Sequence, residues 1–194
     1  MMAFDTERIT PMSRIPTPAT IADAPEKSQL LLNGVNAQLG VVPNMFRLIS
    51  TSPQTLEAYL GVSGALGKGA LPAATRERIA LAVAEVNGCD YCLSAHTYLG
   101  KNLAKLDDAE ITANRNGASN DPKADAAVRF AAKIVRERGQ VSPADLATVK
   151  LAGYTDAQVL EIIMHVAINT FTNYANEVLG TDIDFPTVTA RKAA

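Results

Sequence analysis

Apolar residues recur at helical spacing along most of the chain. In residues 26–39, for example, Leu30, Leu31, Val35 and Leu39 follow the 3.6-residue repeat of a helix. Prolines, glycines and Asn-Gly steps divide this pattern into segments, and no run alternates with the period of two that is typical of a strand. We expect an all-α fold, a single-domain bundle with helices over residues 26–39, 43–49, 53–66, 72–86, 90–104, 107–114, 122–138, from Pro143 onward, and 155–179.

The two ends of the chain lack this helical pattern. Residues 1–22 hold several prolines among polar residues, which predicts an extended arm. Beyond Gly180 the sequence predicts irregular structure. We therefore expect one helical domain over residues 23–186 and a tail over residues 187–194.

Composition fits a soluble globular protein. Of 194 residues, 47% are hydrophobic and 20% are charged. The formal net charge is -2 and no basic block stands out, so we do not expect nucleic-acid binding. The apolar stretch over residues 79–84 is too short to span a bilayer, and the N-terminus lacks an apolar signal core. We expect a cytoplasmic protein that does not bind membranes.

Both cysteines of the protein lie in one CxxC, Cys89 and Cys92. A disulfide between them closes too short a loop to constrain much of the unfolded chain, so a scaffold disulfide is a weak interpretation. A reactive pair, or half of a metal site, is the stronger one. Asn87-Gly88 is expected to end the preceding helix, which puts the pair in the first turn of a new helix. Free amide groups there stabilise a thiolate and lower its pKa.

His96 and Glu77 extend this pair into a candidate relay. His96 lies four residues after Cys92 and therefore on the same helix face, where it can accept the thiol proton. Glu77 would lie roughly 18 Å from Cys89 along one straight helix, at ~1.5 Å rise per residue. A helical hairpin at Gly88 instead returns the second helix beside the first and brings His96 near Glu77. The carboxylate shares an apolar face and needs a partner, so we expect Glu77 to contact His96.

Other interpretations remain open at this stage. The two cysteines could be inert buried thiols in a non-catalytic helical oligomerisation or interaction module. Zinc could bind Cys89, Cys92 and His96 with His165 as a fourth ligand from a distant helix. Glu85 is expected on the solvated side of its helix. The last helix carries a polar stripe, which is usually solvated but also suits a subunit interface or a pocket wall: Glu161, His165, Asn169, Thr172 or Asn173, and Asn176.

The stretch LPAATRERIALAVAEVNGCDYCLSAH, residues 71–96, resembles the core of the alkylhydroperoxidase D and carboxymuconolactone decarboxylase superfamily. The matching positions are Glu77, Cys89, Cys92 and His96. The likeness extends over roughly residues 25–186, and NTFTNYAN at residues 169–176 is similar to the end of peroxidase-related members.

The resemblance implies an all-helical homo-oligomer, often a trimer or hexamer, that reduces hydroperoxides in antioxidant defence. It implies no cofactor and no metal. Carboxymuconolactone decarboxylases proper lack the cysteine pair, so decarboxylation is not expected. The mycobacterial alkylhydroperoxidase D has a histidine immediately before the second cysteine. Here that position is Tyr91, which does not titrate near neutrality.

We expect Cys92 to attack the peroxide and become a sulfenic acid, with His96, backed by Glu77, protonating the departing alkoxide. Cys89, nearer the helix start and expected to be more exposed, would then form a disulfide with Cys92 and meet the reductant. That reductant would be a lipoyl-type dithiol or a thioredoxin-like protein. A dithiol-disulfide oxidoreductase acting on a protein partner is the alternative enzyme.

Overall fold

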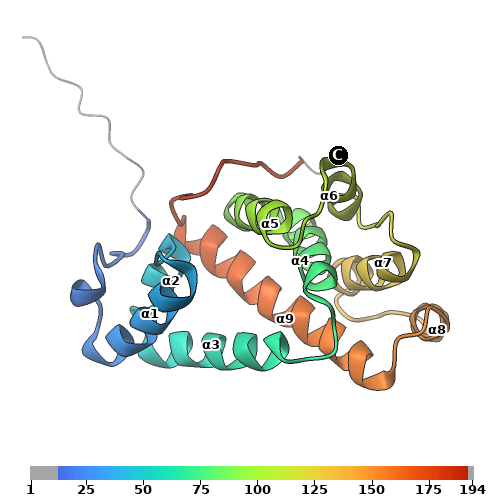
Figure 1. The fold of residues 1–194 in the computed structure, drawn as a ribbon, viewed down its shortest axis with the longest axis horizontal. Coiled ribbons are helices and arrows are strands. Elements are labelled where there is room, and N and C mark those ends of the chain that lie inside the picture. The colour runs from blue at the N-terminus through green and yellow to red at the C-terminus, as the bar shows by residue number, and fades with distance from the viewer. Residues whose placement is uncertain (1–12, 192–194) are drawn as a thin grey trace, which may run out of the picture.

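A computed structural model of the chain describes residues 13–191. Within this range every regular element is helical, which confirms the all-α class (Figure 1). The elements are a short 3₁₀-helix η1 (Ile21–Asp23) and the α-helices α1 (Glu26–Leu39), α2 (Asn44–Ile49), α3 (Pro53–Gly67), α4 (Ala73–Asn87), α5 (Asp90–Asn102), α6 (Asp108–Arg115), α7 (Pro122–Arg136), α8 (Pro143–Leu151) and α9 (Asp156–Leu179).

Capping residues fix the ends of these helices. Side chains of Ser52, Asp107, Asp121, Ser142 and Thr155 each accept a backbone hydrogen bond at a helix start. Glycines with positive φ end the two helices that matter most for the site, at Gly88 and Gly180.

The predicted boundaries hold to within two residues, with small corrections. Pro43 and Pro72 lie just before their helices rather than in the first turn. Helix α5 ends at Asn102 because Lys105 turns the chain with φ 58, and α7 ends at Arg136 because Arg138 does so with φ 52.

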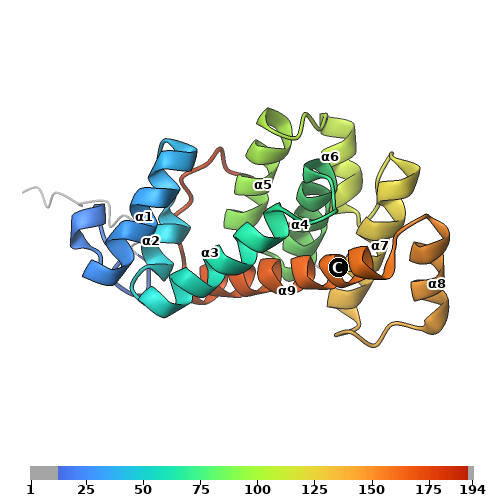
Figure 2. The same ribbon diagram turned by 60° about the horizontal axis from the view of Figure 1, so that its bottom comes forward.

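Helix α4 is the centre of the molecule and packs against α5, α6, α7 and α9. Helix α9 crosses the whole length of the fold, from α8 at one end to α2 at the other (Figures 1 and 2). One buried cluster lies between α4, α7 and α9, and a second, between α4 and α5, includes both cysteines. Helices α1, α2 and α3 enclose a third cluster. The two cysteines therefore lie beside the central helix of the fold.

The segment after α9 runs back over α5 toward α6 (Figure 1). Hydrogen bonds hold it along its length: Ser94 Oγ accepts from Val188 N, Asp90 Oδ1 accepts from Ala190 N, and Arg115 donates to the Thr189 carbonyl. At the other end, Arg14 N donates to Leu179 O, so the chain at Arg14 lies against the end of α9. The remainder of the predicted arm and tail, residues 1–12 and 192–194, lies outside the described residues.

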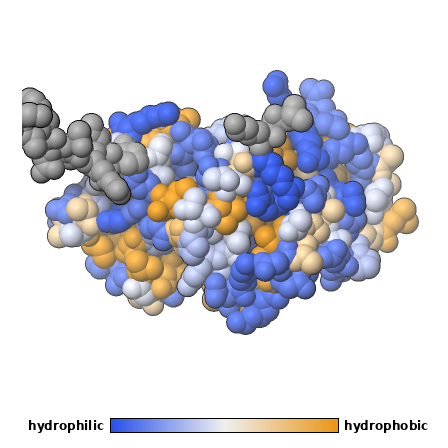
Figure 3. Space-filling model, turned by 90° about the horizontal axis from the view of Figure 1, so that it is seen from above, coloured by the Kyte–Doolittle hydropathy of each residue, from blue (hydrophilic) through white to orange (hydrophobic). Residues whose placement is uncertain are grey.

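Several large apolar side chains of α9 face solvent instead of the core. Phe171 is 39% exposed and Val178 is 61% exposed. Beside them, α3 and α9 form an open apolar groove lined by Ala58, Val62, Met164, Ala167, Ile168 and Phe171, among others. On a different face, apolar patches interrupt a mostly hydrophilic surface over the half of the molecule that contains α1 and α2 (Figure 3). Within residues 13–191, none of the helices is long and apolar enough to cross a bilayer.

Candidate functional site

The turn between α4 and α5 creates the local setting of the two cysteines. Gly88 adopts φ 72, which ends α4 and reverses the chain. Cys89 then occupies the N-cap position of α5, and its Sγ accepts a hydrogen bond from the amide of Cys92 at 3.3 Å. The expected hairpin and helix-start position of the pair are both confirmed.

Both thiols are buried, and Cys89 is the more deeply buried of the two. Cys89 is 0% exposed and Cys92 is 3% exposed. The expectation that Cys89 would be the more exposed thiol is therefore wrong. The physical reason is that the N-cap residue points into the cluster between α4 and α5, where Leu81, Leu93 and Ile111 pack.

Glu77 and His96 are in direct contact, as the hairpin predicts. His96 Nδ1 lies 2.8 Å from Glu77 Oε2, and each side chain is about one-fifth exposed, 21% for His96 and 22% for Glu77. Burial lowers the pKa of His96, but the charge and hydrogen bond of Glu77 outweigh burial and raise it. The Glu77 carboxylate therefore favours the imidazolium form beside the thiol.

The two thiols differ in acidity. A hydrogen bond from Cys89 lowers the pKa of Cys92, burial opposes this, and the nearby charge of His96 lowers it further, to about 7. Asn176 of α9 contributes as well, because its Nδ2 donates to Cys92 Sγ at 3.2 Å. The pKa of Cys89 is raised, by its interaction with Cys92 and by burial. A thiolate near neutral pH therefore resides on Cys92.

Tyr91, between the cysteines, is a structural anchor. Its hydroxyl donates to Asp184 Oδ1 at 2.9 Å and accepts from the amide of Met45 at 3.1 Å. The Phe185 ring lies edge-on against it at 5.8 Å. Burial raises the pKa of Tyr91 further from neutrality. The residue thus ties α5 to α2 and to the segment after α9, and it takes no part in proton transfer near pH 7.

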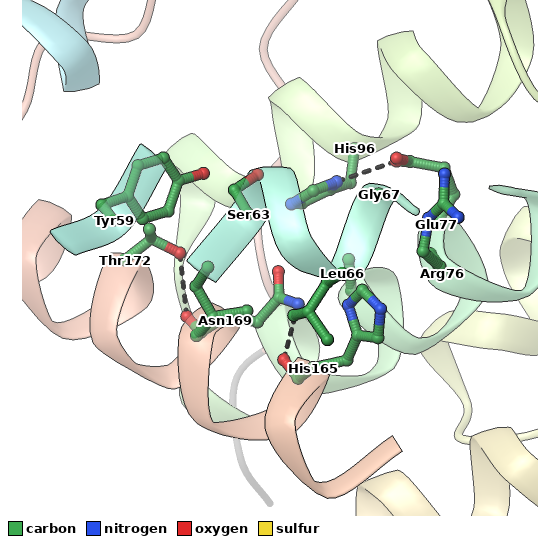
Figure 4. Close-up of a pocket in the computed structure, with 12 residues that line it drawn as sticks. Tyr59, Ser63, Leu66, Gly67, Arg76, Glu77, His96, His165, Asn169 and Thr172 are labelled. Atoms are coloured by element: carbon green, nitrogen blue, oxygen red, sulfur yellow. Dashed lines mark hydrogen bonds and ion pairs between the residues drawn. The ribbon is translucent and has the colours of Figure 1, made fainter. Parts of the chain in front are cut away.

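Two cavities meet at His96. The first, which we call the polar chamber, has a volume of about 250 Å³ and contains Arg76, Glu77, His165 and Asn169 (Figure 4). The second, the apolar pocket, has about 510 Å³ and reaches Cys92. Both cavities are lined by His96 and by Tyr59, Ser63 and Thr172.

The polar stripe of α9 faces inward. The interpretation of the stripe as a solvated face is therefore wrong for most of its residues. The alternative, that the stripe forms a pocket wall, is the correct one. His165, Asn169, Thr172, Asn173 and Asn176 are all buried. Three of them line the polar chamber, where Asn169 donates to the His165 carbonyl and Thr172 to the Asn169 carbonyl (Figure 4). The stripe is buried because the inward face of α9 combines these polar side chains with the core residues Val159, Ile162 and Val166, while a second set of apolar residues faces outward.

His165 stays neutral near pH 7, because burial, together with the charge of Arg76, lowers its pKa to about 4. It lines the polar chamber with His96, whereas Cys92 opens onto the apolar pocket. Among residues 13–191, no three His, Cys, Asp or Glu side chains form a group that could hold a metal ion. The four ligands considered for zinc are thus not arranged as a metal site.

Glu85 was expected on the solvated side of its helix, and this is also wrong. Its side chain is 10% exposed and forms an ion pair with Arg115 at 2.5 Å. Its other carboxylate oxygen accepts from the amide of Arg191. Glu85 therefore fixes α6 and the end of the described chain to α4, away from the thiols.

Sequence reasoning did not identify the other residues around Cys92. Asn176 belongs to the stripe that was noticed, but its contact with the thiol depends on how α9 crosses α5. Tyr59 of α3 and Phe185 complete the walls of the apolar pocket. Nothing in the local pattern marks either residue, because the packing of distant segments places them there.

Comparison with known proteins places this geometry in a family context. Residues 53–137, which include both cysteines, Glu77 and His96, match the carboxymuconolactone decarboxylase family. A sequence search of curated proteins found no match.

Solved structures share the fold. An alkylhydroperoxidase D core, an uncharacterized peroxidase-related protein from Ralstonia eutropha JMP134, aligns at 25% identity over 90% of this chain and 93% of its own, with a TM-score of 0.80. A peroxidase-related protein from Silicibacter sp. TM1040 aligns at 25% identity over 86% and 91%, with a TM-score of 0.75. A variant of the debrominase Bmp8 in complex with 2,3,4-tribromopyrrole aligns at 20% identity over 87% and 90%, with a TM-score of 0.73.

Proposed function

Because this chain belongs to the carboxymuconolactone decarboxylase superfamily, in its alkylhydroperoxidase D-like branch, we propose that it is a thiol-dependent hydroperoxide reductase acting in antioxidant defence. One observation carries the proposal: Cys92 has a pKa of about 7, lies beside the Glu77–His96 pair, and opens onto a cavity. An inert structural pair of cysteines needs neither an acidic thiol nor an adjacent proton donor.

In the first half-reaction, the Cys92 thiolate attacks the distal oxygen of the hydroperoxide. The O–O bond breaks, Cys92 becomes a sulfenic acid, and the departing alkoxide takes a proton from His96. Glu77 acts through His96, because it holds the imidazole in place and favours its charged form. Glu77 is thus a positioning residue.

In the second step, the Cys89 thiol condenses with the sulfenic acid. A Cys89–Cys92 disulfide forms and the sulfenic oxygen leaves as water. Together the steps consume one hydroperoxide and two thiols and yield an alcohol, a disulfide and water. A dithiol then supplies two electrons to regenerate the thiols.

The alternative of a dithiol-disulfide oxidoreductase for protein substrates is disfavoured. Exchange with a folded partner needs an accessible sulfur, whereas Cys89 and Cys92 are both buried.

The exposed apolar side of α9 supports a homo-oligomer, a trimer or hexamer. A solvent-exposed row of large apolar residues on one helix is costly in a monomer and is typical of a subunit interface. The row consists of Leu160, Ile163, Met164, Phe171, Tyr174 and Val178.

The direct test is hydroperoxide consumption by the purified protein with a dithiol present. We expect turnover in the wild type, none in Cys92→Ser, and a single sulfenic acid per subunit without turnover in Cys89→Ser. Unchanged turnover in Cys92→Ser would contradict the proposed function.

A further inference from the structure

The polar chamber holds two groups that the proposed mechanism does not use, His165 of α9 and Arg76 of α4. The His165 ring extends from α9 into the chamber (Figure 4). His165 is 7% exposed, and within residues 13–191 its Nε2 has no hydrogen-bond partner. A buried polar atom of a folded protein is normally hydrogen-bonded. The chamber therefore suits an occupant that can bond to this nitrogen.

Arg76 offers further hydrogen-bond donors beside His165. Its Nη1 donates to the Leu71 carbonyl at 2.9 Å, which uses one of the five N–H groups of a guanidinium. Among the described residues, no Asp or Glu oxygen lies within ion-pair distance of Arg76. The guanidinium is close enough to His165 for its charge to lower the pKa of that imidazole. An arginine of this kind beside a cavity is suited to a carboxylate, whose two oxygens match its planar fork.

The charges around the polar chamber leave one positive charge to be neutralised. Glu77 contacts His96 at 2.8 Å, and the charges of the two side chains cancel when His96 is protonated. Glu161 also affects His165, but its carboxylate does not line the chamber and accepts from two backbone amides in the turn before α4. Arg76 is then the remaining charged side chain of the lining. An occupant with a single negative charge would neutralise it.

The size of the polar chamber and the rest of its wall restrict the occupant further. The cavity has a volume of about 250 Å³, which is below the range of pockets that enclose drug-sized ligands. Leu66, Ala80 and Ile168 line it together with the polar side chains. Their apolar surface favours contact with a short hydrocarbon chain. The chamber thus matches a small molecule with one anionic end and one aliphatic end.

We propose that the polar chamber is a binding site for a short-chain monocarboxylate. The carboxylate accepts hydrogen bonds from the Arg76 guanidinium and from the Nε2–H of neutral His165, and the alkyl chain packs against Leu66 and Ile168. Neither cysteine lines the chamber, so this site is separate from the thiols. The inference does not depend on the proposed function, because binding of the carboxylate involves no redox chemistry.

The two histidines of the protein report directly on this chamber, because both His96 and His165 line it. The reduced full-length protein, labelled with carbon-13 in its histidine rings, is titrated with sodium propionate near pH 7 and followed by proton–carbon NMR. His165→Gln assigns the two signals. We expect both signals to shift and to saturate with one Kd on the order of millimolar, since a ligand of so few atoms can bind only weakly. No saturable shift in the wild type would overturn the proposal.

Two further probes test the ligand class. Propionamide has the shape of propionate without its charge, and chloride has the charge without the planar pair of oxygens. We expect both to bind at least about tenfold more weakly than propionate, because a charge-assisted bidentate contact to arginine is worth at least that factor. Binding of propionamide or chloride as tight as that of propionate would contradict a carboxylate site.

Arg76→Gln should weaken propionate binding by at least about tenfold. Arg129→Gln, at an exposed ion pair on α7, removes the same charge away from the chamber and should bind as wild type does. Because Arg76 also holds the Leu71 carbonyl, circular dichroism checks that the variant folds. If it does not, Arg76→Lys replaces it, which keeps the charge, loses the planar fork and should bind several-fold more weakly. Wild-type affinity in the folded Arg76 variant would overturn the proposal, whether or not the protein consumes hydroperoxide.

Discussion

His96 Nδ1 lies 2.8 Å from Glu77 Oε2, although the two residues belong to different helices and are separated by the turn at Gly88. This contact connects the hairpin to the chemistry, because it favours a positive charge beside Cys92. The acidity of Cys92 therefore depends on a carboxylate that does not touch the sulfur.

Glu77→Gln is expected to raise the pKa of Cys92. Without the carboxylate, the pKa of His96 falls, less imidazolium is present at neutral pH, and the thiolate loses a favourable charge. We expect the thiolate transition, followed by its ultraviolet absorbance, to move from about 7 to roughly one unit higher. The pH dependence of the reaction rate with hydroperoxide should also move to higher pH.

Glu57→Gln is the control for this shift. Glu57 is an exposed acid on α3, so its removal changes the net charge by the same amount without touching the relay. The same displacement in both variants would show that net charge, and not the Glu77–His96 contact, sets the thiol pKa.

Substitution of Asn176 should also raise the pKa of Cys92. In Asn176→Leu the hydrogen bond from Nδ2 to the sulfur is lost. In Asn176→Asp the bond is lost and a negative charge is added, so we expect a larger rise in the thiol pKa. Iodoacetamide alkylation against pH gives both values, and a thiol pKa in Asn176→Asp at or below that of wild type would refute the role of this amide.

Glu110 is expected to stabilise the fold as an anion. Burial alone would raise the pKa of Glu110, but bonds from Ser119, Asn114, the Asn120 amide and Arg78 outweigh it and lower the pKa to about 2. Since the folded pKa lies below the ordinary value, the contribution is complete above about pH 4.5 and is lost as the pH falls toward 2.

Glu110→Gln should lower the free energy of unfolding by about 2–3 kcal/mol at pH 7. The difference from wild type should shrink as the pH falls below about 4. Urea unfolding at several pH values measures this, with Glu137→Gln, at an exposed ion pair on α7, as the control that should change little. A difference between Glu110→Gln and wild type that does not depend on pH would contradict the explanation.

Phe171→Glu should dissociate the proposed oligomer. It places a charge in the exposed apolar row of α9, beside the groove with α3. The control is Leu151→Glu on α8, where the leucine is 88% exposed and lies outside that row. We expect light scattering to give a smaller mass for Phe171→Glu alone, and a wild-type protein that is already monomeric would refute the oligomer.

The sequence was sufficient for elements defined by local signals. Helix boundaries follow from caps, prolines and glycines, and these depend on neighbouring residues only. The Glu77–His96 contact was also predictable, because one glycine-ended turn relates the two helices and sets which residues lie opposite each other.

Features that depend on long-range packing were not predictable in this way. The polar stripe of α9 resembles a solvated face by its periodicity, yet most of its side chains are buried, and one set of apolar residues on the same helix faces outward while Val159, Ile162 and Val166 lie in the core. An amphipathic pattern marks two faces without saying which of them meets the core, and a subunit interface can reverse the usual choice.

The exposure of Cys89 was misjudged for a related reason. Its position at a helix start suggested access to solvent, but the N-cap side chain turns into the cluster between α4 and α5. Only the placement of the neighbouring helices decides whether a helix start is open or covered.

The acidity and reactivity of Cys92 together are tested most directly by one experiment. Reduced protein is mixed with tert-butyl hydroperoxide in a single turnover at a series of pH values, and loss of the Cys92 thiol is followed by quenched-flow mass spectrometry. We predict oxidation much faster than that of free cysteine at neutral pH, with a rate that rises through a transition near pH 7. A rate no greater than that of free cysteine, or oxidation that begins on Cys89, would contradict the assignment.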